Sequence, residues 1–309
     1  MSFAYDVKEE LCRGKRKYRR CCALAEAYGI LLFSGSLRPD RAKMTSEHIY
    51  LVARFVQIIE QETGIELGID NREGSGSYTI TVEDRPLQAI WGQIGAQPFE
   101  EGLRLHIDRS PLGQEHCRAA FVRGAFLQCG TLMDPQRGYH LEMVTTHRQL
   151  SEDLRELLVE MGIPARTVQR KNSYVVYVKG SEAIEDMLNL MGATQSVLQF
   201  MEIKVMRDVR GRVNRKVNCE TANMARTAAA AVRQLQAIET IGNTRGMESL
   251  DDGLRQVAQL RLEYPEMSLK EIGQHCDPPI SRHGVNHRMN RLLQLAQEAQ
   301  QTAQKEEGP

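Results

Sequence analysis

The chain lacks the features that define membrane, secreted and metal-stapled proteins. Its 309 residues contain no apolar run approaching the roughly 18 residues of a membrane-spanning helix, and no apolar signal segment follows the first methionine. The seven cysteines are scattered and odd in number, and no C-x-x-C pair occurs. We therefore expect a cytoplasmic protein with no membrane segment and no disulfide framework.

Excess charge is also absent, because the formal net charge is zero. Any affinity for nucleic acid must then come from local clusters. One cluster is the run Arg13–Arg20, and another is residues 201–216, where six basic residues stand against two acids. A basic cluster is the electrostatic signature of a phosphate-binding surface, although a solvated linker explains the second cluster equally well. The expected phosphate contacts in it are Arg210, Arg212, Arg215 and Lys216.

An internal repeat organises the first two thirds of the chain. Gly29 and Gly35 recur as Gly124 and Gly130, and later motifs match at offsets of 95 to 98 residues. Residues 20–100 and 115–195 therefore look like two copies of one α+β unit. A glycine inside a helix costs about 1 kcal/mol, so it is usually kept where another backbone comes close. We expect the two glycine helices to pack face to face; two unrelated core helices are the alternative.

Local patterns predict the elements of both copies. In the first copy we expect a helix over 8–20 that leads into the glycine helix, a strand near 44–50, a helix over 51–63, and a glycine-rich turn at 71–77 that closes a hairpin onto a strand at 78–82. In the second we expect helices over 119–129, 151–161 and 182–191 and strands near 139–145, 167–169 and 173–178. A long helix over 220–240 and a hinge at Gly242–Gly246 follow.

The last part of the chain has the pattern of a separate three-helix module. An amphipathic helix over Leu250–Tyr264 ends at a proline, and Ser268 with Glu271 forms a capping box that opens a short helix. The turn Asp277-Pro278-Pro279 follows, and Ser281 can cap the third helix.

The third helix has an apolar face and a polar face. Val285, Met289, Leu292 and Ala296 follow helical spacing, and no acid lies between Pro278 and Gln297. Two short helices, a tight turn and a basic third helix describe a helix-turn-helix, in which Asn can pair with adenine and Arg with guanine. A small bundle with a solvated polar face is the alternative. The candidate DNA-binding residues are Ser281, Arg282, His283, Asn286, His287, Arg288, Asn290 and Arg291.

A metal site in the same module is the weaker interpretation. Cys276, His283 and His287 form C-x6-H-x3-H, but structural zinc takes four ligands and usually a close cysteine pair. We therefore predict neither a metal nor another cofactor.

The stretches SLKEIGQHCDPPISRHGVNHRMNRL and NRKVNCETANMARTAAAAVRQL, together with the tandem glycine helices, resemble the WhiA family of bacterial regulators. The resemblance covers nearly the whole chain. It implies an α+β, LAGLIDADG-like αββαββα tandem repeat with pseudo-two-fold symmetry, followed by an all-α helix-turn-helix domain. It also implies roles in transcription regulation, sporulation, cell division and chromosome segregation.

Homing endonucleases with this repeat place a metal-binding acid at the eighth position of each nine-residue motif. Here the motifs are Ala27–Gly35 and Val122–Gly130, so their eighth positions are Ser34 and Cys129. Neither residue is the hard oxygen anion that Mg²⁺ selects. We therefore expect no catalysis; an endonuclease with displaced acids, such as Asp40 and Asp134, is the alternative.

The expected organisation follows from these observations. Residues 1–200 form the repeat domain, 201–247 a basic helical linker, 248–300 the helix-turn-helix domain and 301–309 a disordered tail. The expected partner is double-stranded DNA, with RNA polymerase or a sigma factor as a further candidate, for a monomeric, nucleoid-associated protein.

Overall fold

The structure is a computed structural model that describes residues 2–14, 19–71, 76–99 and 104–306. It divides into two compact units, Met1–Asp208 and Val209–Pro309. Within the described ranges, a search for a helix with the length and apolar character of a membrane span finds none.

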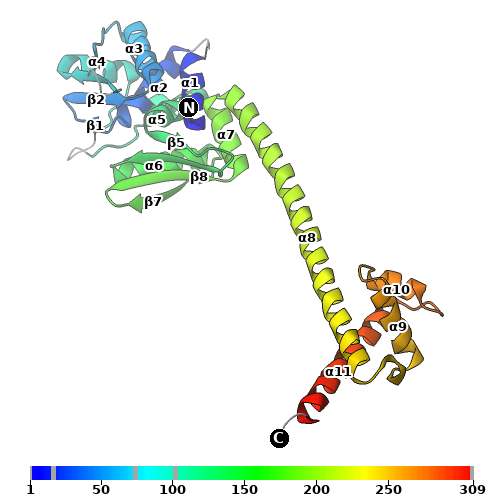
Figure 1. The fold of residues 1–309 in the computed structure, drawn as a ribbon. Coiled ribbons are helices and arrows are strands. Elements are labelled where there is room, and N and C mark those ends of the chain that lie inside the picture. Colours follow the sequence, from blue (N-terminus) through cyan, green and yellow to red (C-terminus); the bar gives the residue numbers. More distant parts are fainter. Residues whose placement is uncertain (1, 15–18, 72–75, 100–103, 307–309) are drawn as a thin grey trace. The chain divides into compact units, whose positions relative to one another are not determined.

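The first unit contains two copies of one αββαββα sequence, preceded by helix α1 (Phe3–Arg13) (Figure 1). The first copy consists of α2 (Arg20–Leu32), β1 (Ser36–Leu37), β2 (Arg41–Ser46), α3 (Ile49–Thr63), β3 (Ile69–Asn71), β4 (Tyr78–Glu83) and α4 (Asp84–Ile94). The second consists of α5 (Glu115–Cys129), β5 (Gly130–Leu132), β6 (His140–Thr145), α6 (Arg148–Glu160), β7 (Arg166–Arg170), β8 (Ser173–Lys179) and α7 (Ser181–Met191), after the short 3-10 turn Ser110–Leu112.

The two sheets have the same topology. Their strand orders are β1-β2-β4-β3 and β5-β6-β8-β7, and every neighbouring pair is antiparallel. Met44 pairs with Ile80 in the first sheet, and Met143 pairs with Val176 in the second. The α+β fold with an internal tandem repeat is therefore confirmed.

Helices α2 and α5 lie side by side and join the two copies (Figure 1). A Cβ atom added to Gly29 would lie 2.3 Å from the carbonyl oxygen of Phe121, and one added to Gly124 would lie 2.1 Å from that of Glu26. Real Cβ atoms do not approach backbone oxygen so closely, so only glycine fits at either position. The expectation that the two glycine helices pack face to face is confirmed.

Several element boundaries differ from the expected ones. The helix predicted over 8–20 ends at Arg13, because Gly14 closes it with a backbone bond to Glu10, and residues 15–18 lie outside the described residues. The hairpin of β3 with β4 is confirmed, although residues 72–75 of its turn also lie outside them. The hinge predicted at Gly242–Gly246 is too long: helix α8 (Thr194–Thr244) continues through Gly242, and positive φ occurs at Gly246.

The second unit is helical. The 3-10 turn Met247–Ser249 leads into α9 (Asp252–Glu263), α10 (Leu269–His275) and α11 (Arg282–Glu306). Its core begins upstream of residue 248, because Ala237, Ile238 and Ile241 of α8 are buried together with Val257 and Met289. Helix α11 runs to Glu306, so residues 301–306 are helical rather than disordered, and residues 307–309 lie outside the described residues.

Candidate nucleic-acid interface

The entry to α10 is fixed by the predicted capping box. The Glu271 amide donates to Ser268 Oγ at 3.3 Å, and the Ser268 amide donates to Glu271 Oε2 at 2.8 Å. The backbone bond from Ser268 lowers the pKa of the Glu271 carboxyl. Two of the otherwise unpaired groups at the helix start are thus satisfied.

The turn between α10 and α11 depends on a glycine that the sequence pattern did not single out. A Cβ on Gly273 would lie 2.4 Å from the carbonyl oxygen of Ile280. The Ile280 amide donates to the Gly273 carbonyl at 2.9 Å, and the Gly284 amide donates to Ser281 Oγ at 3.2 Å. These contacts hold α11 against α10, and Ser281 caps α11 as predicted.

Helix α11 has the two faces that the sequence predicts. Val285, Met289, Leu292 and Ala296 are buried at 4% exposure or less. Seven of the eight candidate DNA-binding residues of this segment are exposed, namely Ser281, Arg282, His283, Asn286, His287, Asn290 and Arg291. Of these, Arg291 is engaged on its own helix, where Nη1 donates to Gln294 Oε1 at 3.0 Å.

Arg288 is the exception: the sequence predicted it among the DNA-binding residues of the polar face, and its placement on that face is wrong. It is half-buried, and its Nη1 donates to the carbonyl oxygen of Gly253 in the first turn of α9 at 3.4 Å. A Cβ on Gly253 would lie 3.1 Å from Arg288 Cζ. The side chain therefore bridges α11 to α9 instead of extending from the polar face.

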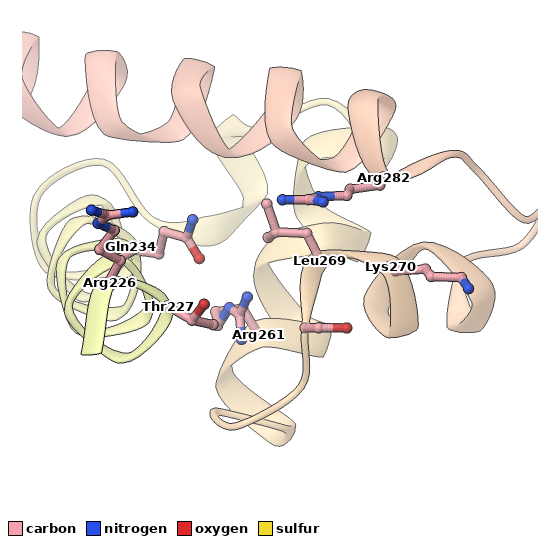
Figure 2. A pocket seen from close by; sticks show the side chains of 9 residues that line it. Arg226, Thr227, Gln234, Arg261, Leu269, Lys270 and Arg282 are labelled. Atoms are coloured by element: carbon pink, nitrogen blue, oxygen red, sulfur yellow. The ribbon is translucent and has the colours of Figure 1, made fainter. Parts of the chain in front are cut away.

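A cationic pocket of about 470 Å³ lies between α8 and the helix-turn-helix (Figure 2). It is lined by Arg226 of α8, Arg261 of α9 and Arg282 at the start of α11; Figure 2 shows the Arg282 side chain directed into it and that of Lys270 of α10 extending away from it. Among the described residues, no carboxylate lines it. Arg261 is 2% exposed and donates to the carbonyl oxygens of Pro265 and Met267 at 3.1 and 2.7 Å; burial lowers its pKa.

The sequence did not indicate this pocket. Arg226 lies in the helical run 220–240, and nothing in that run shows that it packs beside α9, α10 and α11. The predicted basic residues of α8 lie elsewhere on that helix and are all exposed, namely Arg210, Arg212, Arg215 and Lys216. Arg212, Arg215 and Lys216 lie three and four residues apart, so they share one face of the helix, and Arg210 lies on another face.

The zinc pattern of the module is not assembled. Cys276 is 3% exposed, and its thiol donates to the Ile272 carbonyl at 3.3 Å within the core. His283 and His287 are exposed on α11. The three side chains therefore face different environments.

The eighth positions of the two glycine motifs lie at the ends of α2 and α5. Ser34 Oγ is buried and has no hydrogen-bond partner among the described residues, and the Cys129 thiol donates to the Ala125 carbonyl at 3.1 Å. Burial raises the pKa of Cys129 to about 12. The half-buried ammonium of Lys8, whose pKa burial lowers, interacts with Cys129 and lies over the Phe126 ring at 5.7 Å. A neutral thiol beside an ammonium is unsuited to a divalent metal.

The two displaced acids differ in what the structure shows of them. Asp134 Oδ1 accepts from the Gln136 amide at 2.8 Å within a local turn, whereas the bond at Asp40 is made by its backbone carbonyl, which accepts from the Asp84 amide at 2.7 Å. Neither belongs to a group of convergent metal-binding side chains in the part of the chain that the structure describes.

Two family models match the chain. Residues 118–210 match the WhiA LAGLIDADG-like domain, and residues 213–296 match the WhiA C-terminal HTH domain. Relatives include the probable cell division protein WhiA of Clostridium perfringens, 36% identical over 96% of this chain and 98% of its own length. The protein of that name from Clostridium novyi is 34% identical over the same shares.

The fold is similar to that of a solved structure. Full-length DUF199/WhiA from Thermotoga maritima aligns over 97% of this chain and 99% of its own, with a TM-score of 0.57 and 24% identity. The repeat topology and the helix-turn-helix agree with the two matched domain models. This chain belongs to the WhiA family.

Proposed function

We propose that the protein is a sequence-specific DNA-binding regulator that does not cleave DNA and that acts in transcription, cell division and chromosome segregation. The observation that carries this proposal is the exposed polar face at the start of α11, residues 282–291, which contains no acid and is held in place by a buried opposite face. A helix of this kind suits the major groove, where base edges present distinct patterns of donors and acceptors. The name of the Clostridium relatives supports a role in cell division.

Base reading falls to exposed side chains of α11. Asn286 and Asn290 have the paired donor and acceptor that match adenine, and His283 and His287 lie beside them. Arg288 is assigned a different role, because it braces α11 on α9.

Phosphate contact falls to the cations around the pocket and on α8. Arg226 and Arg282 line the pocket, and charged guanidinium groups are the donors that bind an anionic phosphate oxygen most strongly. Arg212, Arg215 and Lys216 add an exposed cationic face that is suited to sequence-independent attraction.

DNA binding is tested with the full chain on a target fragment, which chromatin immunoprecipitation would supply, and on a scrambled fragment at two salt concentrations. Asn286→Ala should reduce the preference for the target by roughly fivefold or more, corresponding to about 1–3 kcal/mol. Arg212→Ala should weaken both fragments equally and reduce the salt slope by about 1. Arg148→Ala, an exposed and ion-paired residue of α6, is the matched control and should change neither. A preference for the target that survives Asn286→Ala contradicts the assignment to α11.

The absence of cleavage is tested separately, because the alternative is a metal-dependent endonuclease with displaced acids. The environment of Ser34 and Cys129 supports an inert site. Supercoiled plasmid incubated with Mg²⁺ or Mn²⁺ and purified protein should stay intact. Nicking that requires the metal and is abolished by Asp40→Asn or Asp134→Asn would establish the endonuclease instead.

The cellular role also implies partners. Double-stranded DNA is the first partner, and RNA polymerase or a sigma factor is a further one. The family resemblance also leads us to propose a monomeric, nucleoid-associated protein with a link to sporulation. Immunoprecipitation of the protein with and without nuclease treatment would separate protein partners from those bridged by DNA.

A further inference from the structure

Four metal-ligating side chains converge in the first unit, outside the DNA-binding module. Cys21 and Cys22 lie in the first turn of α2, and His116 and Cys117 lie in the first turn of α5. One ligand atom of each residue lies within 4.8 Å of those of the other three. In the ranges that the structure covers, this is the one group of its kind.

The group follows the internal symmetry of the unit. Cys22 and Cys117 are separated by the same 95 residues that separate Gly29 from Gly124, and Cys21 and His116 share this offset. Each copy thus contributes one adjacent pair. Because the glycines let α2 and α5 pack backbone against backbone, the two pairs meet where the helices begin.

The distances suit tetrahedral coordination. His116 Nδ1 lies 3.3 Å from Cys22 Sγ and 3.3 Å from Cys117 Sγ. With zinc bonds of about 2.3 Å to sulfur and about 2.0 Å to nitrogen, tetrahedral ligands stand about 3.5 Å apart for N and S and about 3.8 Å apart for two sulfurs. The two distances from His116 Nδ1 to sulfur are therefore within a few tenths of an ångström of the spacing expected around zinc.

Burial holds the thiols of Cys22 and Cys117 in their protonated form. Burial raises the pKa of Cys117 to about 12 and raises that of Cys22, and the neighbouring thiols raise both further. A divalent cation would replace these protons and relieve the repulsion among thiolates.

One neighbour must move. Arg19 Nη1 lies 3.1 Å from His116 Nε2, which accepts this bond only while Nδ1 carries the proton. Coordination through Nδ1 places the proton on Nε2 instead, so Arg19 must turn away. Because Arg19 is exposed, its guanidinium can do so into solvent.

We propose that Cys21, Cys22, His116 and Cys117 form a structural zinc site that clamps α2 to α5 and thereby holds the two repeats together. Three thiolates and one imidazole form a closed Cys₃His set, which is typical of structural rather than catalytic zinc. Cys117 lies on the buried side of the group and Cys21 on its exposed side. Zinc can therefore enter the site from solvent.

The test measures metal on the full chain purified under reducing conditions without chelator. Elemental analysis should find one zinc per chain in the wild type and in Cys219→Ser, the matched control with an exposed cysteine on α8. Replacing Cys21 and Cys22 together by Ser should abolish binding. Cys21→Ser alone changes an exposed side chain, so that variant should fold and should hold zinc more weakly.

Two further measurements separate coordination from a structural effect. Co²⁺ added to the apo wild-type chain should produce the visible and near-ultraviolet bands of tetrahedral thiolate coordination, weakened in Cys21→Ser and unchanged in Cys219→Ser. Chelator should lower the melting temperature reported by Trp91, the single tryptophan, in the wild type but not in the Cys21→Ser/Cys22→Ser chain.

The proposal is overturned if the folded wild-type chain holds no zinc and gives no cobalt spectrum. It is also overturned if the Cys21→Ser/Cys22→Ser chain keeps a full equivalent of zinc. A third outcome would also overturn the proposal: protein prepared without reductant contains a disulfide between Cys22 and Cys117, and the same protein binds no zinc after reduction. That outcome would assign the group to redox chemistry instead.

Discussion

Arg123 of one repeat donates to Glu26 of the other at 2.6 Å, inside the interface between α5 and α2. Glu26 has no exposed side-chain surface, and Arg54 donates to its other oxygen at 3.1 Å. Arg123 also donates to the Met191 carbonyl at 3.3 Å. One carboxylate thus pairs with two guanidinium groups, one from each repeat, and this arrangement links the two repeats.

We expect Glu26→Gln to destabilise the first unit by about 3–5 kcal/mol, because it removes the buried carboxylate that pairs with the guanidinium groups of Arg54 and Arg123. The measurement is denaturant unfolding followed by Trp91 fluorescence, which reports on this unit. Glu160→Gln is the control, since its partner Arg109 and Glu160 are both exposed and such pairs contribute less than about 1 kcal/mol. Equal effects of the two variants would contradict the expectation.

Gly124→Ala should destabilise the same unit by about 1–3 kcal/mol, because the added methyl group meets the Glu26 carbonyl oxygen. Gly92→Ala provides the matched helix control. Gly92 lies in α4 with no atom within 4 Å of an added Cβ, so alanine there should stabilise by about 0.5–1 kcal/mol. The measurement is the midpoint of unfolding followed by Trp91 fluorescence. A shift in the same direction for both substitutions would show that Gly124 is not required by the close packing of α2 on α5.

The stability of the first unit should fall at mildly acidic pH through His48. This residue precedes α3, is 6% exposed, stacks on Tyr5 at 4.2 Å, and has Nε2 3.3 Å from the Tyr5 carbonyl. Burial, aided by the charge of Lys8, lowers its pKa below the ordinary 6.5. A lowered folded pKa means stability that is present above about pH 6.5 and lost as the pH falls through the folded value.

The measurement is the free energy of unfolding by Trp91 fluorescence between about pH 7.5 and about pH 5. The wild type should lose stability more steeply than His48→Gln, whose side chain does not titrate. His147, whose pKa burial also lowers, contributes equally to both proteins and cancels in the difference. Parallel pH profiles for the two proteins would show that His48 does not carry the effect.

Arg288 and Asn286 should respond differently although both were expected to read DNA. Arg288→Ala removes the contact to the Gly253 carbonyl, so it should increase hydrogen exchange of α9 and weaken all DNA sequences. Asn286→Ala should leave exchange unchanged and reduce sequence preference alone. Hydrogen-exchange mass spectrometry and binding isotherms on the same preparations check this. Faster hydrogen exchange of α9 in Asn286→Ala, or unchanged exchange of α9 in Arg288→Ala, would contradict these two roles.

The sequence by itself determined the features that depend on near neighbours along the chain. The capping box of Ser268 and Glu271, the buried stripe of α11 and the glycines of α2 and α5 are set by helix geometry over a few residues. The very short strands β1 and β5 were not predicted, because two or three residues are too few to show an alternating pattern.

Tertiary structure alone decided which distant side chains meet. Arg288 turns to α9 because Gly253 leaves room there, and Arg226 reaches the cationic pocket because the end of α8 packs into the second core. Cys22 and Cys117 meet because the α2 and α5 backbones touch at their glycines, 95 residues apart. Such contacts follow from packing across the whole fold, and no local spacing in the sequence encodes them.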